Sequence, residues 1–182
     1  MDDIVQQAMA KWPNVPDCRG WLGLDARGRW FMRDDAAQAA GPFAGGGANP
    51  QSKGRELLHA GLQAFIGRNY AANALGEWFF QNGPQRVYVE LERAPWVLRL
   101  DAAGSFNMHT GASTAVTEVM QDDEGFVYGA TSQGLGLIHT ADMWQFSEWL
   151  AHHALELKSL PFVAIQQQFG FVLSPAQKKK PA

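Results

Sequence analysis

The chain has 182 residues, 46% of them hydrophobic and 18% charged, which indicates a folded globular protein and excludes a disordered one. A chain of this length can bury a sizeable core without disulfides. The net charge of −3 and the sequence pI of about 5.9 argue against binding to nucleic acid or to an anionic membrane. Lys178–Lys180 are expected to belong to a disordered basic tail over residues 176–182.

A cytoplasmic location is expected, because no segment has the features of a secretory or membrane protein. The N-terminal residues are acidic and lack the apolar region of a signal peptide. No apolar run approaches the roughly 18 residues that a membrane-spanning helix needs. Cys18 is the one cysteine, so an internal disulfide cannot form. No neighbouring residue activates Cys18 as a nucleophile, and its role stays open.

The first third of the chain predicts two helices and a hairpin. Residues 2–11 predict a short amphipathic helix, and residues 20–34 predict a β-hairpin. Residues 35–53, which include three consecutive glycines, are expected to form a flexible loop. A longer helix is predicted over 54–68, with apolar side chains on one face and Ser52 as its N-cap.

Successive strands are predicted over 77–110, with Asn82-Gly83 as a hairpin turn. Side chains of opposite character alternate after this turn: Val87, Val89 and Leu91 face one way, and Arg86, Tyr88, Glu90 and Glu92 face the other. This period of two predicts a strand with one buried face and one solvated polar face. Pro95 predicts that the next segment, over 96–100, lies at a sheet edge or a bulge.

Four turns share one pattern, an Asp or Asn followed three residues later by Gly: Asp25–Gly28, Asn73–Gly76, Asp101–Gly104 and Asp122–Gly125. The first side chain can accept a hydrogen bond from the turn backbone, and the glycine supplies the positive φ that rejoins the strand. Repeated use of one hairpin turn explains the pattern most simply. The alternative is an ancient duplication in which each half carries hairpins and one helix.

The C-terminal part predicts one more helix, which begins after Thr140 and runs to about residue 157. Phe169–Leu173 is expected to be either a final strand or an extended arm over the core. The predicted fold is α+β, an antiparallel sheet of hairpins packed with two main amphipathic helices and a short N-terminal helix. A single domain is expected over residues 1–175, with internal duplication as the open alternative.

Two segments carry a resemblance to known families: Gly76–Leu100, which reads GEWFFQNGPQRVYVELERAPWVLRL, and Gly20–Gly28, which reads GWLGLDARG. Together they resemble a proteobacterial family of uncharacterised proteins, and the resemblance covers roughly residues 10–175. A weaker likeness links the Asp-x-x-Gly-x-Trp hairpin, the strand Arg86–Glu90 and residues 134–150 to a second uncharacterised bacterial family. Both resemblances imply a small α+β bacterial protein, and neither transfers a catalytic residue.

The motifs for metal and phosphate chemistry are incomplete. Glu56 and His59 form half of a di-iron pattern, and His152 and Glu156 could contact a metal together, but surface polar residues explain both pairs. The segment 47–53 lacks the glycine that precedes the lysine of a phosphate loop, so a flexible linker is expected. We expect no catalytic residue, no metal and no cofactor.

One group of polar and aromatic residues remains as a candidate ligand site. Arg86 offers a fork of donors and Tyr88 a flat ring with a polar tip, and the two share a strand face. A carboxylate or phosphate could bind if this face borders a cleft. The candidate ligand-binding residues are Arg86, Tyr88, Gln81, Asn82, Trp78 and His109. The simpler interpretation is a solvated face on which Arg86 pairs with Glu90 or Glu92.

No motif identifies a function. Abundant aromatic residues, 12% of the chain, and the lack of a catalytic set favour a non-catalytic binding or protein-interaction module. The alternative is a protein that binds a small anionic metabolite, or an enzyme of unknown class, using the Arg86/Tyr88 face. A protein partner or a homodimer is compatible with the sequence, whereas nucleic acid and membranes are not expected as partners.

Overall fold

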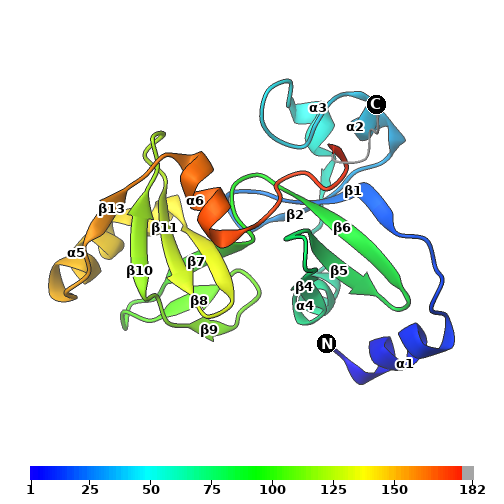
Figure 1. The fold of residues 1–182 in the computed structure, drawn as a ribbon, viewed down its shortest axis with the longest axis horizontal. Helices are drawn as coiled ribbons and strands as arrows, with labels where there is room; N and C mark the ends of the chain where they lie inside the picture. Colours follow the sequence, from blue (N-terminus) through cyan, green and yellow to red (C-terminus); the bar gives the residue numbers. More distant parts are fainter. Residues whose placement is uncertain (178–182) are drawn as a thin grey trace. The chain divides into compact units, whose positions relative to one another are not determined.

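The computed structural model describes residues 1–177, which divide into two compact units. Unit 1 comprises residues 1–25, 29–92 and the C-terminal segment from Val172, and unit 2 comprises 26–28 and 93–171. Each unit contains one β-sheet with its own helices (Figure 1), which confirms the α+β class. The expectation of one domain over residues 1–175 stays a prediction. Lys178–Lys180 lie outside the described residues.

The sheet of unit 1 has the strand order β3-β2-β1-β6-β5-β4. Its strands are β1 (Cys18–Leu24), β2 (Trp30–Met32), β3 (Arg55–Glu56), β4 (Tyr70–Ala72), β5 (Trp78–Asn82) and β6 (Gln85–Leu91). Its helices are α1 (Asp3–Lys11), α2 (Asp35–Ala39), α3 (Pro50–Lys53) and α4 (Ala60–Arg68). Neighbouring strands are antiparallel except β1 and β6, which are parallel. The predicted N-terminal helix and first hairpin are therefore confirmed.

Side chains cover both faces of this sheet. On one face, the rings of Trp30 and Tyr70 lie 5.3 Å apart and α4 packs Phe65 against Phe80 of β5 at 5.4 Å. On the other face, Phe43 lies directly over Gly23 of β1, where an added Cβ would be 2.4 Å from the Phe43 ring. Glycine at this position therefore lets the loop before α3 pack flat on the sheet.

The segment predicted as a flexible loop contains α2 and α3. Asn49 is the N-cap of α3, and its side chain forms a capping box with Ser52, which lies inside the helix. Ser52 is therefore not the cap of the longer helix, and the predicted start at residue 54 is wrong. Residues 55–56 pair with β2 instead, and His59 caps α4 by accepting from the Leu62 amide at 3.1 Å.

The sheet of unit 2 has the strand order β13-β10-β11-β12-β7-β8-β9. Its strands are β7 (Trp96–Leu100), β8 (Phe106–Met108), β9 (Ser113–Thr114), β10 (Glu118–Gln121), β11 (Val127–Thr131), β12 (Gly134–Ile138) and β13 (Leu157–Ser159). A 3-10 turn (η1, Thr140–Asp142) leads into α5 (Met143–His152), and α6 (Phe162–Phe169) follows β13. The strand after Pro95 lies between β12 and β8, so its predicted edge position is wrong.

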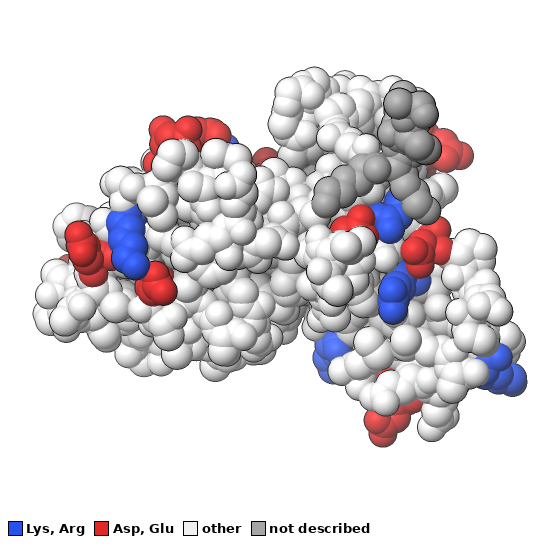
Figure 2. Space-filling model, in the orientation of Figure 1, with Lys and Arg blue, Asp and Glu red and all other residues white. Residues whose placement is uncertain are grey.

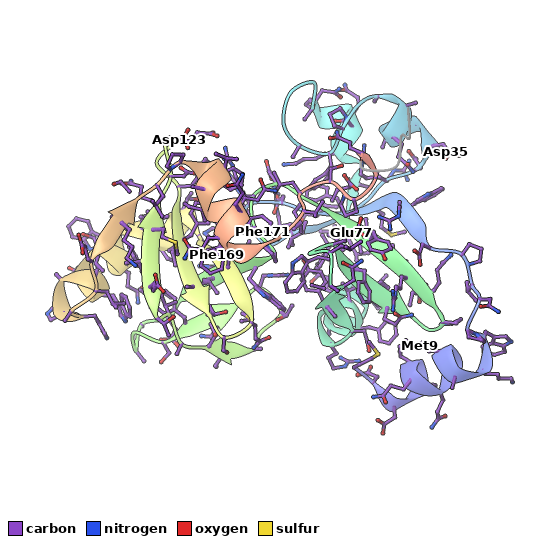
Figure 3. All side chains as sticks on the ribbon, in the orientation of Figure 1. Met9, Asp35, Glu77, Asp123, Phe169 and Phe171 are labelled. Atoms are coloured by element: carbon purple, nitrogen blue, oxygen red, sulfur yellow. The ribbon has the colours of Figure 1, made fainter. Side chains whose placement is uncertain are left out.

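Two predictions for the C-terminal part are corrected by unit 2. The helix predicted to reach residue 157 ends at His152, because Leu157–Ser159 pair in parallel with β10. Phe169 ends α6 rather than starting a strand, and Phe171 is buried near the end of that helix (Figure 3). The Phe162 ring of α6 lies 6.0 Å from Tyr128, so α6 covers one face of the sheet.

The two sheets share strand order, strand direction and register over six strands. The order β3-β2-β1-β6-β5-β4 repeats as β9-β8-β7-β12-β11-β10, and the central pair is parallel in both. The pair Phe79–Tyr88 corresponds to Tyr128–Leu137, and the parallel pair Leu22–Val89 corresponds to Leu98–Ile138. The four Asp/Asn-x-x-Gly turns occupy two equivalent places in each sheet. This agreement supports the duplication alternative over independent use of one turn.

Candidate functional site

The structure brings three of the six predicted site residues onto one face of the β5–β6 hairpin. Gln81 and Arg86 are cross-strand partners, and Tyr88 follows two residues later on the same face. The Arg86 guanidinium lies 4.9 Å from the Phe79 ring centre. Tyr88 is 3% exposed and the Arg19 guanidinium covers its ring at 3.7 Å. The prediction of a solvated polar face is therefore wrong at Tyr88.

The other three residues do not join this face. Asn82 is exposed at the end of β5, and Trp78 lies on the opposite face, with its ring 4.8 Å from that of Tyr70. His109 belongs to unit 2, where its Nδ1 accepts from the Val97 amide at 3.2 Å. The predicted ligand site is consequently not assembled within unit 1.

The expected ion pairs of Arg86 are also absent among residues 1–177. The carboxylate of Glu92 accepts from Lys53 at 3.0 Å, and that of Glu90 is held by the C-terminal segment. No salt bridge of the described chain involves Arg86. Arg86 therefore rests on an aromatic ring without a carboxylate partner in the described part of the chain.

A buried polar cluster occupies the same face beside Tyr88. Arg19 of β1 donates to the Glu77 carboxylate at 3.1 Å, and the Asn73 amide donates to its second oxygen at 2.9 Å. Glu77 lies immediately before β5 (Figure 3) and is buried. Opposite charges with shared hydrogen bonds make this burial tolerable, since an unpaired buried charge would cost several kcal/mol.

Residues 172–177, here called the C-terminal strap, extend along this face of unit 1. The Leu91 amide donates to the Leu173 carbonyl at 2.7 Å, so the strap is bonded to β6. The Ser174 hydroxyl and the Ala176 amide both donate to the carboxylate of Glu90, the latter at 3.1 Å. Burial raises the pKa of Glu90 above the ordinary glutamate value, although these two bonds act in the opposite direction.

Arg33, at the end of β2, ties several backbone segments of unit 1 together. It is 4% exposed, and its guanidinium donates to the carbonyls of Ser52 (2.7 Å), Gly20 (3.2 Å), Ala37 (3.3 Å) and Gly41 (2.6 Å). Burial lowers the pKa of this guanidinium. The bonds connect α2 and α3 to β1, so Arg33 fixes the walls of the two hollows described next.

The smaller hollow is a cavity of about 370 Å³ between Arg33 and the strap. Gln38, Glu90 and Ser174 contribute polar side chains to its lining, together with the backbone near Gly20 and Gly41. All of these residues belong to unit 1.

The larger hollow is a groove of about 710 Å³ along β3, here called the edge groove. Trp21, Met32 and Leu58 line it and remain 43%, 53% and 78% exposed. Arg55 and His59 add cationic and hydrogen-bonding groups. Because β3 is the last strand of its sheet, the groove lies along an open sheet edge.

Charge is distributed in small mixed groups. On the face drawn in Figure 2, blue and red side chains are scattered and often adjacent, without a continuous basic area. Among residues 1–177, no helix has the length and apolar character needed to cross a bilayer. Within the same residues, no three His, Cys, Asp or Glu side chains gather as ligands for a metal ion.

The residues that sequence reasoning missed are those of the two hollows. Arg33, directly after β2, and Glu90, within β6, are charged residues next to apolar ones in the sequence, and this mismatch was an available signal. Trp21 and Met32 gave no such signal in the sequence, because an aromatic or apolar side chain in a strand usually belongs to the core. The strap contacts depend on residues more than eighty positions apart, which no local pattern reveals.

No curated protein matches the sequence. Two solved structures are similar in part, both of DUF1285 family proteins. The one from Shewanella baltica has 16% identity and a TM-score of 0.48, and the match covers 71% of this chain and 92% of that one. The one from Silicibacter pomeroyi has 14% identity and a TM-score of 0.49, covering 81% and 84%. A family model named DUF2944, described as "Protein of unknown function (DUF2946)", matches residues 1–176, and the chain belongs to that family.

Proposed function

We propose that the chain is a non-catalytic binding protein of the cytoplasm, and that its edge groove holds an extended peptide segment of a partner protein. The observation that carries the proposal is the gathering of Trp21, Met32 and Leu58, all strongly exposed, around a groove along an open strand. The partner segment presents an apolar side chain and, two residues later, an acidic one.

The apolar side chains supply the reason for a ligand. Three large apolar residues within one concave surface leave an area in water that a folded protein usually covers. Burial of a leucine-sized side chain in such a groove contributes about 1.5–3 kcal/mol. Tryptophan at the wall makes the contact rigid at little entropic cost, as in many protein interfaces.

The open edge supplies the reason for an extended ligand. β3 pairs with β2 through Phe31–Glu56 and Met32–Arg55, and no strand covers its other side within the described chain. An extended segment can add to such an edge through main-chain hydrogen bonds, while alternate side chains enter adjacent pockets. A strand so added places its residues i and i+2 on one face of the sheet.

The charges beside the edge groove favour a partner segment that has an acidic residue close to its apolar residue. Arg55 lies directly opposite Met32 and has no ion-pair partner among residues 1–177. Glu56 beside it is already paired with Arg29 at 3.2 Å. An incoming carboxylate would therefore meet a free guanidinium, which forms short charge-assisted bonds with carboxylates.

The test uses a fluorescein-labelled peptide, Thr-Leu-Thr-Asp-Thr, measured by fluorescence anisotropy against the full chain. We expect Trp21→Ala to weaken binding about tenfold, which corresponds to about 1.4 kcal/mol. Arg55→Glu should weaken it further and reverse its salt dependence, because salt then screens a repulsion between two carboxylates. The matched control is Trp144→Ala, because Trp144 is 79% exposed on α5 of unit 2 and should leave the affinity unchanged.

Several results would contradict the proposal. One is peptide binding that Trp21→Ala and Trp144→Ala weaken equally. Another is undiminished binding of a peptide with lysine in place of aspartate. The wild type could instead self-associate in analytical ultracentrifugation, and Trp21→Ala could abolish that association. In that case the occupant of the groove would be a second copy of the chain. Recovery of the chain with a membrane or secreted fraction would contradict the cytoplasmic location.

A second candidate function rests on Arg86, which is stacked on Phe79 and has no carboxylate partner in the described chain. A small anion could bind this guanidinium on the strand face that Arg86 shares with Gln81. The Arg86→Ala variant should then lose a saturable response to inorganic phosphate or acetate in NMR titration. A wild-type protein without such a response would exclude this candidate.

A further inference from the structure

We propose that the cavity beneath the C-terminal strap is a separate site for a small α-amino amide, a molecule with a primary amine next to a carbonyl oxygen. The cavity lies within unit 1, and its volume of about 370 Å³ is in the range of small-molecule sites. It does not include the exposed apolar side chains of the edge groove.

The amine is selected by Glu90. Glu90 is 3% exposed, and its carboxylate accepts two hydrogen bonds, from the Ser174 hydroxyl and the Ala176 amide. An ionised carboxylate has about four acceptor positions, so further donors can be accommodated. The raised pKa of Glu90 agrees with a carboxylate that lacks sufficient solvation. An ammonium group in the cavity would supply both the missing donors and the opposite charge.

The carbonyl oxygen is selected by Gln38. The side-chain nitrogen of Gln38 is buried and has no hydrogen-bond partner among residues 1–177, which leaves a donor without an acceptor. Gln38 lines the same cavity as Glu90. An unsatisfied buried amide destabilises the folded chain, and a ligand oxygen would recover part of that loss.

Arg33 does not turn the cavity into an anion site. Four hydrogen bonds already run from its guanidinium to the carbonyls of Ser52, Gly20, Ala37 and Gly41. A guanidinium has five N–H donors, so little capacity remains for an anion. The cavity lining thus combines the Glu90 carboxylate and backbone carbonyls with the Gln38 amide donor, which fits a ligand that carries both an ammonium group and a carbonyl oxygen.

The experiment titrates glycinamide into the ¹⁵N-labelled full chain and follows the side-chain amide of Gln38 and the backbone amides of Ser174 and Ala176. We expect saturable shifts at these groups. N-acetylglycinamide, which lacks the ammonium, should bind about tenfold more weakly, and acetate should not shift them.

Two variants locate the site. Glu90→Gln should reduce the affinity for glycinamide about tenfold, whereas the matched control Glu92→Gln, directly after β6, should not. Gln38→Met retains the side-chain length and should also weaken the binding of glycinamide. If Glu90→Gln fails to fold, this second variant still tests whether the ligand binds in the cavity. Trp21→Ala should leave the response to glycinamide intact, because that residue belongs to the edge groove.

The proposal is overturned if the three reporter groups do not shift, if the acetylated compound binds as well as glycinamide, or if both cavity variants bind like the wild type. Binding of acetate with shifts at Gln38 would show an anion site instead. None of these results bears on the peptide proposal, whose peptide and variants are different.

Discussion

Replacing Arg33 with methionine tests whether one buried side chain holds the walls of both hollows. Methionine keeps a similar aliphatic length but removes all four hydrogen bonds to backbone carbonyls. The bonds to Ser52 and Gly41, at 2.7 and 2.6 Å, are the shortest. Hydrogen bonds to a charged group contribute about 1.5–3 kcal/mol each, and the two longer bonds add less. Removing the cost of burying the Arg33 charge offsets part of this sum. We therefore expect the free energy of unfolding to fall by about 4 kcal/mol.

The assay is urea unfolding followed by circular dichroism, with the free energy of unfolding extrapolated to water. Arg55→Met is the matched control, because Arg55 is exposed and should change stability by less than about 0.5 kcal/mol. The reasoning is refuted if Arg33→Met loses less than about 1 kcal/mol. A large equal loss in both variants would also refute it, because the effect would then not come from the carbonyl bonds.

Three further predictions test other parts of the structure. The pKa of Glu90 is raised in the folded chain, so its stabilising contribution is complete below the ordinary value of 4.5 and is lost as pH rises through the folded pKa. Wild-type stability should therefore fall relative to Glu90→Gln across this window, and a constant difference in pH-dependent urea unfolding would contradict the assignment. Arg86→Ala should keep the fold, with a change below about 1 kcal/mol, and unfolding in circular dichroism would make Arg86 structural. Asp122→Ala should cost about 3 kcal/mol, because Asp122 also accepts from the buried Tyr128 hydroxyl at 2.8 Å, whereas Asp101→Ala, at a turn of the same sequence pattern, should cost about 1 kcal/mol. Equal shifts of the melting temperature in the two turn variants would contradict this prediction.

The hairpins were predictable because their turns are specified locally. In each of the four turns, the side chain of the first residue accepts from the backbone amide four residues later, as Asp25 does from Arg29 at 2.8 Å and Asp122 from Phe126 at 2.8 Å. The glycine at the fourth position has a positive φ in every case, such as 77° at Gly28. Local chemistry of this kind can be read from the sequence.

The errors occur where distant partners decide the structure. The helix predicted from residue 54 starts later because β2 pairs with residues 55–56, and the helix predicted to reach 157 stops because β10 pairs with β13. Tertiary pairing thus overrode helical periodicity. The polar face near Tyr88 was predicted to be solvated, but Arg19 and the strap cover it. The alternation itself was read correctly, because period-two patterning shows which side chains share a face and not what packs on it.

The division into two units had only a weak trace in the sequence. The turn pattern suggested duplication, and the matching registers of the two sheets support it. The proposed halves did not each carry one helix: unit 1 places α4 before β4, whereas unit 2 has α5 and α6 after β12. Helices added at different places conceal a repeat that the strands retain.

The central claim is that the edge groove binds an extended segment that pairs with β3. The most direct measurement is a search for NMR contacts between the labelled full chain and the peptide Thr-Leu-Thr-Asp-Thr. The account predicts cross-strand contacts between peptide backbone protons and those of Arg55 and Glu56, together with shifts of the Trp21 indole and the Met32 methyl group. Saturable binding with contacts confined to other residues, or no binding at millimolar peptide, would contradict it.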